Sequence, residues 1–255
     1  AVADFGDPAA ERRAALSAGA ICDLSHRALI AVEGEDAFSF LQGQLTCDMN
    51  EISGERSRLA AWCSPKGRVL ALFRLLRLES GFLLELPKAQ LETTLLRLSM
   101  YVLRARVSLE PVSDDFLQVG LAGGSASELI AKRYGSAPEL PDQVATAGGN
   151  RIIRLRGDPP RFQFIGAAPD AKALWESAAG LLTPAGFAAW SLLGILAGVP
   201  EEVGGDEHLP QMINLDVLEG LSFTKGCYVG QEIIARTHHL GRLKRRMYVI
   251  ASAAG

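Results

Sequence analysis

The segment KGCYVGQE, Lys225 to Glu232, places one cysteine between a lysine and a glycine-flanked turn. A thiol attacks as its thiolate, and both the Lys225 ammonium and the amides of a helix starting near Gly230 would lower the pKa of the Cys227 thiol. Gly226 and Gly230 would permit positive φ angles and let the backbone approach a ligand closely. A small buried cysteine beside a surface lysine is the simpler alternative, and a K-x-C pair alone favours it.

Asp48 is the second candidate for chemistry, because it closes the segment LTCDM at the end of an apolar helical pattern. A carboxylate held in a pocket at this point can orient or deprotonate a ring nitrogen. An exposed aspartate at a helix end is the commoner case. The residues by themselves therefore leave Asp48 open between a binding role and a surface role.

Two histidines and a basic run follow the cysteine segment. His238 and His239 are adjacent, so they point in different directions on a helix, and no acidic or thiol partner stands four residues away. The sequence therefore predicts no metal site. Arginine matches the geometry of carboxylates and phosphates, so the basic run could bind a ligand that carries such a group. A solvent-exposed basic surface is the alternative. The members of the basic run are Arg242, Lys244, Arg245 and Arg246.

The composition indicates a globular protein of a reducing compartment. The chain has 255 residues, of which 48% are hydrophobic, enough for a substantial core. Its formal net charge of −3, from 26 basic and 29 acidic residues, gives no global attraction to nucleic acid or to an anionic membrane. The four cysteines form no C-x-x-C pair, which disfavours structural zinc and fits reduced thiols in the cytoplasm. The most apolar stretch, residues 181–199, is broken by glycines and a proline, so no membrane span is expected.

Apolar periodicity predicts the elements that position these residues. An acidic pair precedes a helix whose apolar face ends near Asp48. Three strands follow, RLAAWC, RVLALFRLLRL and FLLEL, separated by the turns SPKG and ESG. A helix from Pro87 to about Val102 and the strand ARVSLEP complete this first set.

The pattern then renews from Phe116. It predicts the strand FLQVGLA, a helix near residues 125–134, a loose segment at 136–150, the strands RIIRLR and RFQFIGA, and a helix after Pro169. A final strand is predicted over RMYVIAS. Runs of strands broken by single helices favour an α+β fold with antiparallel sheets over a doubly wound nucleotide-binding fold.

The full segment KGCYVGQE resembles the K-G-C-Y-x-G-Q-E signature of the folate-binding YgfZ family, whose members resemble the glycine-cleavage T-protein, an aminomethyltransferase. The likeness extends to PQMINLD, ARTHHLGRLKRR, FLQGQLTCDM and SPKGRVL, so it covers most of the chain. It implies a T-protein type fold with domains in a ring around a tetrahydrofolate pocket. It also implies a role in maintaining iron–sulfur enzymes, some of which modify tRNA. Direct binding of nucleic acid is not expected, because the net charge is negative.

The resemblance implies two interleaved α+β units with antiparallel sheets. The first would comprise residues 1–48 and 114–183. The second, ferredoxin-like unit would comprise residues 49–113 and 184–240. Residues 241–255 would start a C-terminal β-barrel that is truncated or reduced in this chain.

The resemblance also implies the roles of the site residues. Cys227 would be the reactive or ligand-contacting thiol, with Lys225 and Asp48 as the other reacting groups. Tetrahydrofolate, or a one-carbon derivative of it, would have its glutamate tail near Arg236 or the basic run. The implied folate contacts are Asp48, Trp190, Tyr228, Gln231, Glu232 and Arg236, and the implied loop glycines are Gly226 and Gly230.

Two positions depart from the family pattern. Gly194 stands where relatives commonly have arginine, and Leu196 stands where the T-protein has a glutamate that binds the pterin ring. Leu196 counts against the first alternative to a YgfZ-type protein, a folate-dependent aminomethyltransferase that uses Asp48. Cys227 counts against the second alternative, a non-catalytic interaction scaffold.

Overall fold

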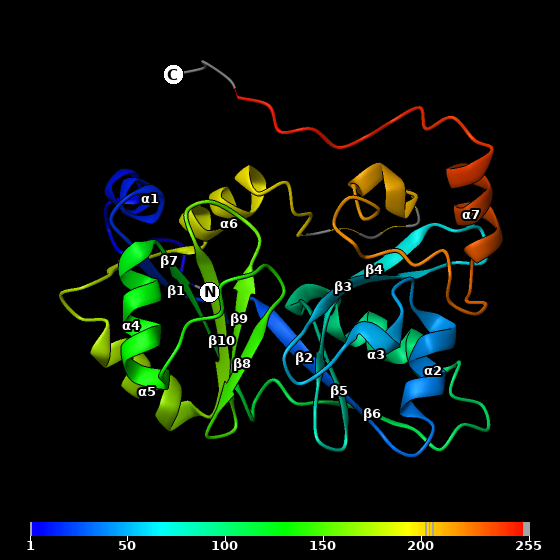
Figure 1. The fold of residues 1–255 in the computed structure, drawn as a ribbon, viewed down its shortest axis with the longest axis horizontal. Helices are drawn as coiled ribbons and strands as arrows, with labels where there is room; N and C mark the ends of the chain where they lie inside the picture. Colours follow the sequence, from blue (N-terminus) through cyan, green and yellow to red (C-terminus); the bar gives the residue numbers. More distant parts are fainter. Residues whose placement is uncertain (1, 202, 204, 206, 252–255) are drawn as a thin grey trace.

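The computed structural model describes residues 2–201, 203, 205 and 207–251, and it contains two β-sheets with helices around them. Figure 1 shows the two sheets in separate halves of the molecule, with α4 and α5 beside one and α2, α3 and α7 beside the other. All strand pairs are antiparallel except β1 with β11. The expected α+β class with antiparallel sheets is confirmed.

The first sheet has the strand order β11-β1-β7-β10-β9-β8. Side chains alternate between its two faces, so Ile21 packs outward on α4 and α5, whereas its neighbours Ala20 and Cys22 face the second half of the molecule. Helices α1 and α6 lie beside β1 and β11. The elements of this half are α1 (Pro8–Leu16), β1 (Ala20–Asp23), β7 (Leu117–Ala122), α4 (Gly124–Tyr134), β8 (Val144–Ala147), β9 (Asn150–Leu155), β10 (Arg161–Gly166), α5 (Ala168–Ser177), β11 (Thr183–Ala185) and α6 (Phe187–Leu196).

The second sheet has the strand order β3-β4-β5-β2-β6 and is apolar on both faces. Its outer face packs on α2 and α3, and its inner face, through Leu29, Leu76 and Leu83, packs on the first sheet. Both faces of an apolar strand must be covered, which explains why this sheet lies between layers. Its elements are β2 (Arg27–Glu33), α2 (Ala37–Gln44), η1 (Met49–Glu51), β3 (Arg58–Cys63), β4 (Val69–Arg77), β5 (Gly81–Pro87), η2 (Lys88–Gln90), α3 (Leu91–Ser99), β6 (Ser108–Pro111), η3 (Pro210–Ile213) and α7 (Gln231–His239).

The chain visits the first sheet, the second, the first again and then the second, but at positions other than those expected. The boundary at Asp48 is wrong, because β2 precedes it and pairs with β5 and β6 of the second sheet. The boundary at Pro184 is also wrong, because Trp190 and Leu193 of α6 pack in the core of the first sheet. Hydrophobic pattern alone does not say which sheet a strand joins, since pairing partners are distant in sequence.

Most predicted elements are confirmed, including the three-stranded meander β3 to β5 and the helix that begins after Gly230. The loose segment at 136–150 contains β8, which was not expected. The strand predicted over RMYVIAS is wrong for residues 246–251, which have no regular structure. Met247 donates one backbone hydrogen bond to the Met212 carbonyl at 2.8 Å, too little for a strand. The barrel expected from residue 241 thus has no strand up to residue 251, and residues 252–255 lie outside the described ones.

Candidate functional site

Lys225 is buried, and it fastens the loop that carries Cys227 to the turn that follows α2. Its Nζ donates to the carbonyls of Leu45 at 2.8 Å and Cys47 at 2.7 Å. The ammonium also lies 5.0 Å from the ring centre of Tyr228. Burial lowers the pKa of Lys225 to about 8, although Cys47 and Asp48 act in the opposite direction.

Further hydrogen bonds join the same two segments. The Thr46 hydroxyl donates to the Gly220 carbonyl at 2.7 Å, and the Ser222 amide donates to the Thr46 carbonyl at 2.9 Å. The Val229 amide donates to the Gly43 carbonyl at 3.3 Å. We call residues 220–230 the signature loop. It is held along its length against residues 43–47, which fixes the position of whatever its exposed side chains present.

Asp48 lies at the end of this contact and caps the short helix η1. Its carboxylate accepts from the Asn50 amide at 3.0 Å, the Asn50 side chain at 2.9 Å and the Gln42 side chain at 3.0 Å. The backbone hydrogen bond from Asn50 is the main reason that the pKa of Asp48 is lowered. Asp48 is therefore an ionised acceptor at neutral pH, close to the buried ammonium of Lys225.

Cys227 is the exposed member of the four cysteines, none of which forms a disulfide. The Lys225 ammonium, expected to act on this thiol, has two carbonyls and a ring as its partners instead. Gly230 has φ +83°, and a Cβ there would lie 2.5 Å from the Ser64 carbonyl oxygen, so this position requires glycine. The positive φ expected at Gly226 is wrong, and a Cβ there would meet open space, so the backbone conformation does not require glycine at this position.

The other expected folate contacts on this side divide between the interior and the surface. Tyr228 is buried, and its hydroxyl has no hydrogen-bond partner among the described residues. Burial raises the pKa of Tyr228, so the phenol stays protonated. Gln231 is half-buried, whereas Glu232 and Arg236 are exposed along α7. Asp48, Lys225 and Tyr228 are brought together, and the α7 side chains lie outside that group.

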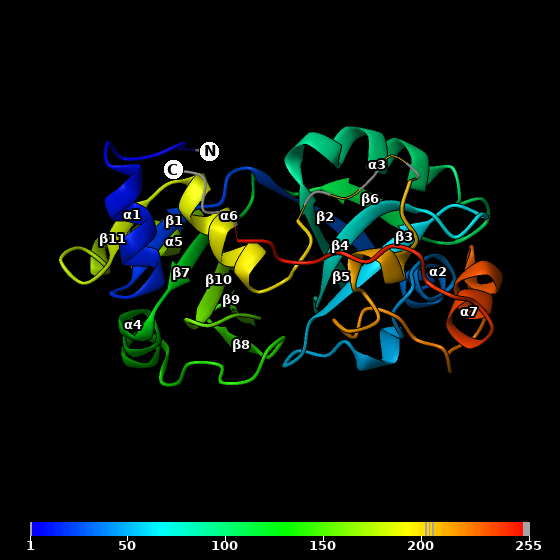
Figure 2. The ribbon, with the colours of Figure 1, turned by 90° about the horizontal axis from the view of Figure 1, so that it is seen from above.

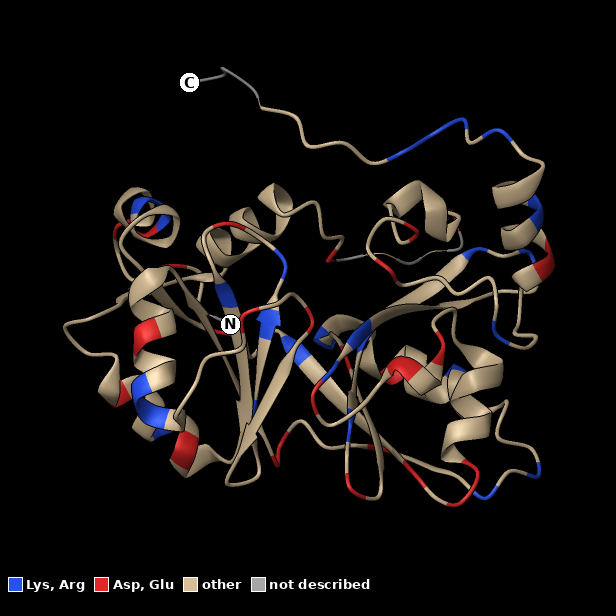
Figure 3. Cartoon of the chain, in the orientation of Figure 1, with Lys and Arg blue, Asp and Glu red and all other residues tan. Residues whose placement is uncertain are grey.

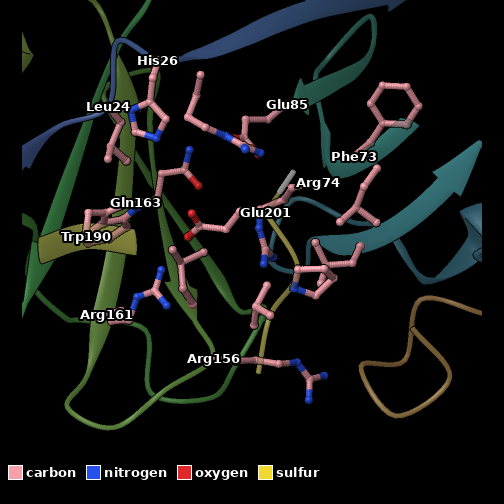
Figure 4. A pocket seen from close by; sticks show the side chains of 16 residues that line it. Leu24, His26, Phe73, Arg74, Glu85, Arg156, Arg161, Gln163, Trp190 and Glu201 are labelled. Atoms are coloured by element: carbon pink, nitrogen blue, oxygen red, sulfur yellow. The ribbon is translucent and has the colours of Figure 1, made fainter. Parts of the chain in front are cut away.

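Trp190 lies elsewhere, at a cavity of about 60 Å³ between the two sheets that both apolar and charged side chains line. We call this the inter-sheet cavity. Figure 4 shows Arg161 of β10 and Glu201, which follows α6, directed into it beside the Trp190 ring. The Arg161 guanidinium stacks on Trp190 at 4.6 Å from the ring centre. Neither charged residue was predicted, since a charge at the start of a strand or after a proline carries no distinctive pattern.

The other charged residues that line the inter-sheet cavity form ion pairs. Arg27 pairs with Glu85 within the second sheet. Asp142 pairs with Arg74 of the second sheet at 2.6 Å and with Arg156, next to the first sheet, at 3.1 Å. Burial alone would raise the pKa of Asp142, but the two arginines outweigh it and lower that pKa. Figure 3 shows basic residues on strands of both halves where the halves meet.

The inter-sheet cavity and the signature loop are neighbours. Leu59 and Leu72 line the cavity and also belong to the apolar cluster that contains Tyr228. The residues expected to contact one ligand thus lie in two neighbouring groups. One is formed by Asp48, Lys225 and Tyr228, and the other by Trp190 with charged residues that the sequence did not single out.

The basic run and the histidines lie at the outer end of the site. Arg246 is engaged by Asp216 at 2.7 Å, whereas Arg242, Lys244 and Arg245 are exposed. The His238 ring stacks on Phe223 at 3.9 Å between ring centres. Over the described ranges, no group of three metal-binding side chains is found, and no helix is long and apolar enough to cross a bilayer.

Comparison with known proteins identifies the family and the fold of the chain. The family model of the GCVT N-terminal domain matches residues 5–141. The tRNA-modifying protein YgfZ of Colwellia psychrerythraea is 34% identical over 91% of this chain and 71% of its own length. The tRNA-modifying protein YgfZ of Edwardsiella ictaluri is 33% identical over 88% of this chain and 69% of its own length.

The fold has a counterpart among solved structures. Glycine cleavage system aminomethyltransferase T from Bartonella henselae matches with a TM-score of 0.77 at 21% identity. The match covers 90% of this chain and 65% of that protein, so the chain spans about two thirds of its length. The chain belongs to the YgfZ family of GCVT-domain proteins and has the fold of aminomethyltransferase T.

Proposed function

We propose that this protein binds tetrahydrofolate, or a one-carbon derivative of it, in the cytoplasm and supports the assembly or repair of iron–sulfur enzymes, including enzymes that modify tRNA. One observation carries the proposal. The signature loop presents the exposed Cys227 thiol while buried Lys225 fastens the same loop to the turn that bears Asp48. The names of the YgfZ relatives as tRNA-modifying proteins support the same direction.

The chemistry of the residues fits a reduced folate. Bound folate would supply a ring system with amine nitrogens that carry a one-carbon unit. Asp48, kept ionised by its hydrogen bonds, would accept from an N–H group of that ring system. The unpartnered Tyr228 hydroxyl is a second polar atom that a ligand would satisfy, since buried polar groups are normally hydrogen-bonded.

The surface beyond α7 fits the other end of the ligand. A folate tail carries carboxylates, and this protein has a net charge of −3, so the tail needs local cations. Arg236 and Arg245 are exposed and available for that contact. Arg246 is already paired with Asp216, which makes it a weaker candidate than its neighbours.

Aminomethyl transfer is the second candidate, because the ionised state of Asp48 suits a group that handles a folate amine. Leu196, 48% exposed at the surface of α6, supplies no carboxylate for the pterin ring and weighs against productive transfer. An exposed thiol in a loop held by buried hydrogen bonds weighs against a scaffold without chemistry.

Calorimetric titration with tetrahydrofolate tests the binding part of the proposal. We expect the native protein to bind and Asp48→Asn to bind at least tenfold more weakly, because a charged acceptor is worth roughly 1.5–3 kcal/mol. Asp115→Asn, a change at an exposed aspartate before β7, serves as the matched control. Absence of binding by the native protein would reject the folate proposal.

The cellular part needs a separate measurement. Cys227→Ala should bind tetrahydrofolate with little change yet fail to restore iron–sulfur enzyme activity in cells that lack the protein. Restoration by Cys227→Ala would remove the thiol from the proposal. An assay of methylene transfer from an aminomethylated carrier separates the transferase, which turns over, from the YgfZ-type role.

A further inference from the structure

The outer face of α3 and of the turn after it exposes large apolar side chains. Leu96 is 70% exposed, Met100 is 64% exposed and Leu103 is 91% exposed. They follow one another at spacings of four and three residues, which places them on one side of a helix. Figure 2 shows α3 at the outer edge of the second half of the molecule. A contiguous exposed apolar surface of this kind marks an interaction site.

The backbone keeps turning beyond Ser99, the last residue of α3. The Tyr101 amide donates to the Leu98 carbonyl at 3.0 Å, and the Val102 amide donates to the Ser99 carbonyl at 3.1 Å. Each of these bonds spans three residues, as in a 3-10 turn, so the chain continues in the sense of the helix. Met100 therefore follows Leu96 along the same side.

Leu103 ends this turn in a strained conformation. Its φ is +36°, in the left-handed region that glycine or asparagine normally takes after a helix. A leucine there meets a steric cost, and the cost is not offset by burial within the protein, because the side chain is almost fully exposed. Strain that serves nothing inside the monomer points to contact with a partner.

Opposite charges stand at the two ends of this surface. Glu92 lies four residues before Leu96, and Arg104 lies four residues after Met100. Both are exposed, and neither has an ion-pair partner among the described residues. We call Glu92, Leu96, Met100, Leu103 and Arg104 the α3 strip. Its order is acid, apolar, apolar and base at a constant spacing of four residues, with Leu103 beside the base.

This order is complementary to itself when two copies lie antiparallel. A two-fold axis across the middle of the strip sets Leu96 of one copy against Met100 of the other, and it sets Glu92 against Arg104. Each contact then occurs twice. Parallel strips would instead set Glu92 against Glu92 and Arg104 against Arg104, and like charges repel.

We propose that two copies of this protein associate through the α3 strip, with the strips antiparallel about a two-fold axis. The apolar side chains leave water in the contact, and the ion pairs at its ends fix its direction. The strip is short beside a standard interface, which buries roughly 800 Å² on each partner, so the dimer is weak. It contains none of the residues of the proposed folate site, so dimerisation and folate binding are tested separately.

The charge of the strip argues against a bilayer as its occupant. Attraction to anionic lipids needs an excess of basic residues, whereas the acid and the base of the strip balance. Arg97 of α3 does not change this balance at the centre of the strip, because its guanidinium stacks on the Trp62 ring, 5.5 Å from the ring centre.

Sedimentation equilibrium of the full chain, from micromolar to millimolar concentration, tests the proposal. The mean mass of the native protein should rise toward twice that of the monomer. Leu96→Glu puts a charge in the middle of the apolar contact and should weaken dimerisation by about tenfold or more. Leu103→Gly suits the left-handed backbone, so it should also weaken dimerisation while unfolding in urea at no lower concentration than the native protein.

Charge reversal tests the antiparallel direction. Glu92→Lys sets like charges together at both ends of the contact, as does Arg104→Glu, so each should weaken dimerisation by about tenfold. The double variant re-forms both ion pairs with the signs exchanged and should dimerise within about threefold of the native protein. Glu128→Lys, at an exposed glutamate of α4 in the other half, is the matched control and should dimerise like the native protein.

The outcomes decide between the surfaces. A native protein that stays monomeric over the whole range overturns the proposal, and so does one that is monomeric and sediments with anionic vesicles. If Leu96→Glu and Leu103→Gly dimerise as strongly as the native protein, the dimer uses another face. If the double charge variant dimerises no better than the single ones, the antiparallel arrangement is wrong. The substituted side chains are exposed, so all variants should fold, which circular dichroism checks.

Discussion

Replacing Lys225 with methionine tests whether the signature loop is held by a buried ammonium. Methionine keeps the length of the side chain and removes the charge. Burial lowers the pKa of Lys225 from 10.5 to about 8 in the folded protein. Each pKa unit corresponds to about 1.4 kcal/mol, so the protonated Lys225 destabilises the folded state by about 3 kcal/mol.

The sign of the pH dependence follows from that difference. Below pH 8 the lysine is charged in both states, and the whole cost is present. Between pH 8 and pH 10.5 the unfolded chain holds the proton more often than the folded one, so stability rises as the pH rises. From about pH 7 to pH 9, the free energy of unfolding of the native protein should rise by roughly 1 kcal/mol relative to that of Lys225→Met.

The difference in stability at a single pH is less informative. At neutral pH the variant escapes the cost of the buried charge, but the carbonyls of Leu45 and Cys47 lose their donor, worth roughly 1.5–3 kcal/mol for each charged hydrogen bond. These effects oppose each other. The change with pH isolates the ionisation, because the hydrogen bonds are missing from the variant at every pH.

Urea unfolding at several pH values up to about 9 provides the assay. The window stops there because Cys22 and Cys47 have pKa values raised to about 12 by burial, against 9.0 when unfolded, and their ionisation in the unfolded chain would lower stability at higher pH. Lys172→Met, at an exposed lysine of α5, is the control. The reasoning is refuted if the free energy of unfolding of the native protein minus that of Lys225→Met stays constant or falls as the pH rises from 7 to 9.

Three further perturbations have definite expected results. Asp142→Asn should lower the free energy of unfolding by about 3–5 kcal/mol in a urea titration, because Arg74 loses its buried partner. A loss below about 1 kcal/mol would contradict the importance of this ion pair. Gly230→Ala should cost about 2 kcal/mol in the same assay, since φ is +83° and the new Cβ would meet the Ser64 carbonyl, and an unchanged midpoint would show that the turn relaxes freely. Cys227→Ala should change the free energy of unfolding by less than about 0.5 kcal/mol, because the side chain is exposed. Titration of the native protein with a thiol reagent should show one thiol that reacts fast and three that react only on unfolding.

Local sequence determined the elements that carry the candidate site. Alternation of side chains over a sheet and the turns between strands are short-range properties, which is why β3, β4 and β5 and the start of α7 were predictable. The glycine at 230 is likewise a local requirement of its backbone angle. The eight residues from Lys225 to Glu232 were enough to indicate the family, because such a signature is specific in itself.

Tertiary structure decided where those elements went and what their side chains met. β2 joined the second sheet because its hydrogen-bonding partners, β5 and β6, lie far along the chain, and no local pattern encodes that pairing. Lys225 turned toward the carbonyls of Leu45 and Cys47, about 180 residues earlier in sequence, a contact that no local pattern encodes. Arg161 and Glu201 share a cavity only because two sheets pack face to face there. Such long-range contacts set the burial and the partners of each charged side chain, and local sequence patterns do not encode these contacts.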